Sequence, residues 1–83
     1  MVINFHPHAL DRIEERGATL DEVRKTIENG ESFPAKFERI GFRRNFVFDS
    51  HFRGKYYQTK QIEAYAVQND TDWLVITVIT KFF

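Results

Sequence analysis

Residues 6–17, HPHALDRIEERG, contain both a start signal and a stop signal for a helix. His6 stands at the N-cap position, and Pro7 follows at the first helical position, where its missing backbone N–H costs nothing. Gly17 supplies the left-handed residue that commonly ends a helix. The stretch therefore predicts a helix over residues 7–16, close to the N-terminus.

This predicted helix has two different faces. At about 100° per residue, its apolar side consists of Ala9, Leu10, Ile13 and Gly17. A second arc consists of His8, Arg12, Glu15 and Arg16. The apolar side favours docking on another element. The second arc combines imidazole, guanidinium and carboxylate groups, which serve proton transfer and phosphate binding. A charged arc is also typical of any surface helix.

The remaining elements follow from caps and from alternation. Thr19 and Glu22 form a capping box that predicts a second helix over residues 20–29, which Gly30 ends. The later segments have the spacing of strands, and Met1 to Phe5 is a short leading strand. Strand-like segments cover 32–40 (an edge or irregular start because of Pro34), 42–48, 55–67 and 73–83.

These elements predict one domain, residues 1–83, of the α+β class. We expect an N-terminal two-helix hairpin packed on an antiparallel sheet of about four strands. In the segment 55–67, alternation places Tyr57 and Glu63 on one side and Lys60 and Ile62 on the other. The last segment is apolar on both faces, which is typical of a central strand covered on both sides.

Composition narrows the class of protein. Hydrophobic residues make up 42% and aromatic residues 16%, which suits a packed core. The absence of cysteine excludes disulfides and cysteine-type zinc sites and fits a reducing compartment. No signal peptide or membrane span is evident, so we expect a cytoplasmic protein without a membrane partner. A domain this small is also compatible with a homodimer.

The net charge is zero, but the charges are unevenly distributed. Residues 32–60 contain seven basic and two acidic side chains with aromatic residues between them. This mixture suits a polyanion whose bases can stack, and the candidate substrate-binding residues are Arg43, Arg44 and Tyr57. It equally suits strands whose arginines simply face water.

The charged arc of the first helix and Lys60 together contain what a metal-independent ribonuclease needs. Such an enzyme uses a base for the ribose 2′-hydroxyl, an acid for the departing 5′ oxygen and cations for the phosphate. The predicted roles are an acid or base for His8, a base or orienting group for Glu15, and charge stabilisation for Lys60. Arg12 and Arg16 would bind the phosphate. The alternatives are ordinary ones: an ion pair within the helix and a solvated strand lysine.

No cofactor motif is present, and His6 and His8 have no third metal ligand nearby, so we expect neither cofactor nor metal.

Four stretches resemble a widespread bacterial family of small domains that opens on the pattern HAxxRxxxRG and is similar to the RelE and BrnT toxins of toxin–antitoxin pairs. The stretches are residues 8–17, the capping-box helix that ends in ENGE at 28–31, Tyr57-x-x-Lys60-x-Ile62, and WLVITVIT at 73–80. The resemblance implies a RelE-like two-layer fold. The family pattern applies directly to His8, Arg12 and Arg16, and through strand context to Lys60 and Thr77, a further substrate-binding residue.

The resemblance also implies a function. We expect the toxin component of a toxin–antitoxin pair, a metal-independent endoribonuclease that leaves 2′,3′-cyclic phosphate ends and has RNA and an antitoxin protein as partners. Toxins of this kind are often basic, whereas this chain is neutral overall. The alternative is a non-catalytic domain of the same fold that binds protein or nucleic acid.

Overall fold

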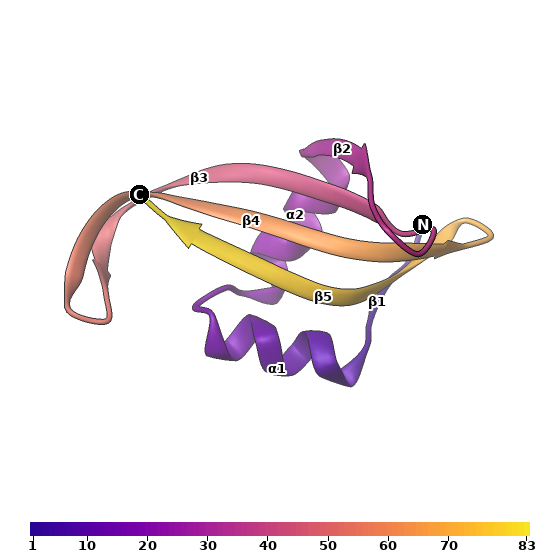
Figure 1. Ribbon diagram of the computed structural model, residues 1–83, viewed down its shortest axis with the longest axis horizontal. Coiled ribbons are helices and arrows are strands. Elements are labelled where there is room, and N and C mark those ends of the chain that lie inside the picture. The colour runs from indigo at the N-terminus through magenta and orange to yellow at the C-terminus, as the bar shows by residue number, and fades with distance from the viewer.

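The computed structural model describes residues 1–83 and contains two helices and one five-stranded sheet. The elements in chain order are β1 (Ile3–Phe5), α1 (Pro7–Glu15), α2 (Leu20–Asn29), β2 (Glu31–Pro34), β3 (Ile40–Phe52), β4 (Lys55–Asn69) and β5 (Asp72–Phe82). The strands lie in the order β1-β5-β4-β3-β2, and the helices cover one side of the sheet (Figure 1). We call the other side the open face.

The predicted α+β class is confirmed, but two details of the prediction are wrong. The sheet has five strands rather than about four, and the leading strand joins it as β1, so the two helices follow the first strand of the sheet rather than forming an N-terminal hairpin on a four-stranded sheet. β1 pairs in parallel with β5, with Ile3 opposite Trp73, whereas all other neighbours are antiparallel. A strand of three residues is too short for its pattern to indicate a partner seventy positions away in the chain.

The helix boundaries follow the local signals. The His6 side chain accepts a hydrogen bond from the His8 backbone nitrogen at 3.0 Å, and α1 begins at Pro7. Thr19 and Glu22 form the predicted capping box at the start of α2. α1 ends one residue earlier than predicted, and Gly17 has the left-handed φ of +72°. Neither helix has the length and apolarity needed to cross a membrane.

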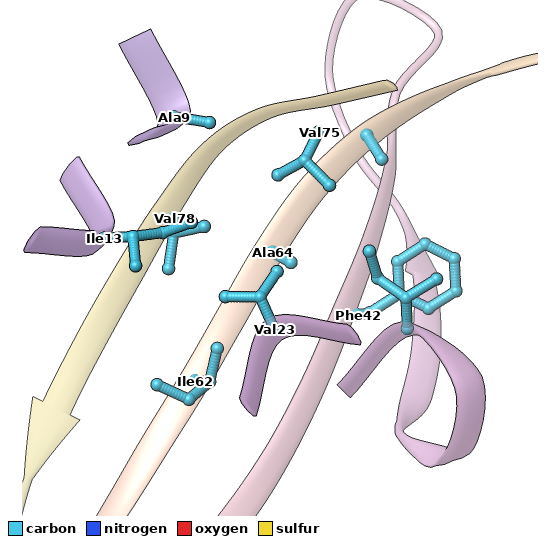
Figure 2. Packing of buried hydrophobic residues seen from close by; sticks show 10 residues of the cluster. Ala9, Ile13, Val23, Phe42, Ile62, Ala64, Val75 and Val78 are labelled. Atoms are coloured by element: carbon cyan, nitrogen blue, oxygen red, sulfur yellow. The ribbon is translucent and has the colours of Figure 1, made fainter. Parts of the chain in front are cut away.

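The core lies between the helices and the sheet (Figure 2). Its members are Ala9 and Ile13 of α1, Val23 and Ile27 of α2, and Phe42, Ile62, Ala64, Ala66, Val75 and Val78 of the strands. The alternation predicted for β4 is confirmed, since Lys60 and Ile62 are both buried on the helix side. The apolar side of α1 is narrower than predicted, because Leu10 is 44% exposed.

β5 differs from its prediction in how it is covered. Its Val75 and Val78 are buried under the helices, but on the open face Thr77 and Ile79 are only half-buried. No second layer packs there (Figure 1). The apolar run therefore corresponds to a strand that is buried under the helices on one face and only half-buried on the other.

Candidate functional site

The charged arc of α1 makes contacts within the domain. Arg12 forms an ion pair with Glu15 at 2.7 Å, and Arg16 donates from Nη1 to the backbone oxygen of Val78 at 2.6 Å. β1 pairs with β5 only as far as Val75, so this carbonyl lies beyond the end of β1. Arg16 thus satisfies a strand edge that would otherwise lack a donor.

Lys60 is buried beneath the loop that joins the helices. Its Nζ donates to the backbone oxygen of Gly17 at 2.8 Å and to the Glu22 carboxylate at 3.0 Å, and it lies 5.2 Å from the centre of the Phe48 ring. The Lys60 side chain is 8% exposed. These contacts satisfy the ammonium inside the protein, as a buried charge requires.

The three predicted catalytic residues are not brought together. His8 is exposed in the first turn of α1, whereas Lys60 contacts Gly17, just after its last turn. The separation of His8 and Gly17 in the chain corresponds to about 13 Å along a helix axis. Glu15 lies near the Lys60 end but pairs with Arg12. Proton transfer between groups this far apart has no direct path.

The predicted substrate-binding residues of the strands separate as well. Arg43 and Arg44 are consecutive in β3, so their side chains lie on opposite faces of the sheet. Arg43 is on the open face, whereas Arg44 lies on the helix side, with its guanidinium 4.9 Å from the Phe46 ring centre. Tyr57 packs near Phe82 towards the β3–β4 turn. Thr77 is on the open face.

A cluster of charged and polar groups, which we call the open-face cluster, surrounds Glu63. It consists of Arg43, Glu63, Tyr65 and Lys81. The Glu63 carboxylate accepts from Arg43 Nε at 2.7 Å and from the Tyr65 hydroxyl at 3.2 Å, and Lys81 Nζ lies 3.7 Å away. The Glu63 side chain is 4% exposed, whereas those of Arg43 and Lys81 are 38% and 57% exposed. A buried carboxylate therefore holds two cations at the surface.

The neighbours of Glu63 and Tyr65 shift the pKa values of these two groups in opposite directions. Burial alone would raise the pKa of Glu63, but the Arg43 hydrogen bond, the charges of Lys81 and Arg43 and the Tyr65 hydroxyl hold it below its usual value. Burial, together with the charge and hydrogen bond of Glu63, raises the pKa of Tyr65. At neutral pH the cluster therefore contains an ionised carboxylate and a protonated phenol.

Beside the cluster, the open face is hollowed into a groove of about 440 Å³. Its lining residues are Phe33, Pro34, Ala35, Lys36, Phe37, Arg39, Tyr65 and Thr77. Phe33 meets Tyr65 edge to face at 6.0 Å, and the Arg43 guanidinium lies 4.6 Å from the Phe33 ring centre. The lining combines three aromatic rings with two cations and includes no acidic residue.

Gly41 makes room for Phe33, one of the rings that line the groove. A β-carbon at this position would lie 2.3 Å from the Phe33 ring, so a larger residue would displace the ring from its place against β3. The alternation of the segment 55–67 predicts that Glu63 and Tyr65 share a face, and the hydrogen bond between them is consistent with this. The register that places Arg43 opposite Glu63 has no comparable local signal.

A family model described as Domain of unknown function (DUF4258) matches residues 5–80. The chain belongs to this family. The match includes α1 and every residue that lines the groove, and it ends one residue before Lys81 of the open-face cluster. No curated protein and no solved structure matches the chain.

In this DUF4258 domain, only Arg43 and Thr77 of the predicted site residues lie at the open-face groove or cluster. The others lie on α1, under the helices or towards the β3–β4 turn. No three histidine, aspartate or glutamate side chains are grouped in a way that could hold a metal ion.

Proposed function

We propose that this domain binds single-stranded RNA on the open face of its sheet. The observation that carries the proposal is the groove, where aromatic rings and the cations Lys36 and Arg39 adjoin the exposed cations Arg43 and Lys81. Proteins that bind single strands combine cations for phosphates with aromatic rings for bases. The aromatic rings distinguish this surface from α1, whose Arg12 and Arg16 already have partners within the chain.

Cleavage of the bound RNA is a second candidate, favoured by the protonated Tyr65 between charged groups. The 2′ oxygen would attack the phosphorus and the bond to the 5′ oxygen would break, with Tyr65 giving that oxygen a proton. Glu63 would take the 2′-hydroxyl proton, and Arg43 and Lys81 would stabilise the charge on phosphate. Because Glu63 is 4% exposed, substrate would have to displace its neighbours to reach it, so binding is the first proposal.

The toxin proposal adds a partner to this scheme. A toxin that acts through the open face would be neutralised by an antitoxin protein that covers the groove. The resemblance in sequence supports this proposal, and so does the two-layer arrangement with one uncovered sheet face. A homodimer is also compatible with a surface left uncovered.

Arg43 and Arg44 provide a matched pair of variants for the binding proposal. We expect Arg43→Gln to weaken binding of a short labelled oligouridine by about fivefold to tenfold and to reduce the salt dependence by about one unit of slope. Arg44→Gln removes the same charge from the other face and should bind like the wild type. Fluorescence anisotropy in the presence of a chelator measures both.

Arg43→Gln also removes one partner of Glu63, which then keeps the Tyr65 hydroxyl and the more distant Lys81. Lys81→Gln is the control, because it removes a cation at an exposed position and leaves the Arg43–Glu63 pair in place, and a similar loss of binding is expected. Equal effects of Arg43→Gln and Arg44→Gln would contradict the proposal. The same samples, analysed for 2′,3′-cyclic phosphate ends, distinguish a nuclease from a binding domain.

A further inference from the structure

The loop between β2 and β3 has an unusual backbone at the edge of the groove. Phe37 and Glu38 both have left-handed φ angles, of 60° and 59°. The loop is closed by a hydrogen bond from the Ala35 nitrogen to the Arg39 oxygen at 2.9 Å. Left-handed φ is unfavourable for bulky residues, and such positions persist where the surrounding structure imposes them, often at ligand sites.

The same loop exposes a large apolar side chain. Phe37 is 82% exposed, although it lines the groove, and the Arg39 guanidinium lies 5.7 Å from its ring centre. Exposure of an aromatic ring to water is unfavourable and is not compensated by packing within the chain. Phe37 therefore combines an unfavourable backbone conformation with an unfavourable exposure of its ring to water.

We propose that Phe37 and Tyr65 form a binding site for one unpaired nucleobase, with Arg39 and Lys36 holding the adjoining phosphate. This inference rests on the proposed function and deepens it by assigning the residues that stack on one base of the single-stranded RNA and hold its phosphate. The groove volume of about 440 Å³ lies in the range typical of small-ligand sites. A base inside a duplex cannot enter such a groove, because its faces and its pairing edge are already occupied.

Charge favours a nucleotide over an apolar peptide as the occupant. Two of the lining residues are cations, and no lining residue is acidic. Aromatic stacking is tolerant of base identity, so the site selects for an unpaired base rather than for one sequence.

The test uses oligouridine with a single 2-aminopurine, whose fluorescence is quenched when the base stacks. We expect the wild-type protein to quench the free strand and to bind its duplex much more weakly. Phe37→Ala should abolish quenching and weaken binding about 5- to 100-fold, and Phe37→Trp should restore both. Phe83→Ala is the matched control, because Phe83 is 58% exposed but lies outside the groove.

Phe37 is so exposed that its truncation should leave the fold intact, which circular dichroism checks. RNA binding with no quenching, or binding unchanged in Phe37→Ala, would overturn the stacking site while leaving the proposed function. Equal binding of duplex and single strand would overturn it as well. No RNA binding at low salt would overturn the proposed function itself.

Discussion

Replacing Gly17 with alanine is expected to lower the free energy of unfolding by about 2–5 kcal/mol. Gly17 has a φ of +72°, which is unfavourable for any residue with a β-carbon. An added β-carbon would also lie 2.5 Å from the Phe52 ring. That ring cannot easily move, because it stacks on Phe82 at 4.3 Å and the adjacent Arg53 is bonded to the end of α1.

Gly54→Ala is the matched control for this substitution. Gly54 also has a left-handed φ, of +83°, but nothing lies within 4 Å of an added β-carbon. The decrease in the free energy of unfolding of Gly54→Ala should therefore reflect the backbone alone and amount to about 1–2 kcal/mol. Urea unfolding of both variants measures the difference. Equal losses of stability in the two variants would show that the Phe52 ring does not constrain Gly17.

Lys60→Met is expected to lower the free energy of unfolding by about 2–4 kcal/mol. The substitution keeps an unbranched side chain but removes the ammonium that bonds to Gly17 and Glu22. Breaking a fully buried pair costs about 3–5 kcal/mol, and the range is reduced here because Glu22 is partly exposed and also accepts from the Thr19 nitrogen.

The control is Lys55→Met at the exposed β3–β4 turn, where we expect a change within about 0.5 kcal/mol. Adding Glu22→Gln to Lys60→Met should recover part of the lost stability, because a neutral amide then replaces the carboxylate that Lys60→Met leaves unpaired. If Lys60→Met is as stable as Lys55→Met, Lys60 is not a structural residue, and a role in charge stabilisation regains support.

Local signals in the sequence predicted local structure well. The His6–Pro7 start, the capping box of Thr19 and the left-handed Gly17 each depend on neighbours within a few residues, and each is present in the structure. The partner of β1 was not predictable in this way, because its parallel pairing with β5 depends on residues at the other end of the chain.

The candidate site shows the same division. Alternation in β4 placed Lys60 and Ile62 on one face, but it did not indicate that this face is buried at Lys60. Lys60 was therefore predicted to be either a charge-stabilising residue or a solvated lysine, whereas its ammonium is bonded inside the domain. Alternation also separates Arg43 from Arg44, but composition treats the two as equivalent. The open-face cluster was missed because Glu63 meets Arg43 only through the register of two strands. Residue types alone do not contain that information.

The most direct measurement of the central claim is a map of amide chemical-shift changes when oligouridine is added to the labelled protein. The account predicts changes in the 35–39 loop and at Arg43, Tyr65 and Thr77, with α1 unchanged. Changes confined to α1, around His8, Arg12 and Arg16, would contradict it and would place RNA on the helix instead of on the open face of the sheet.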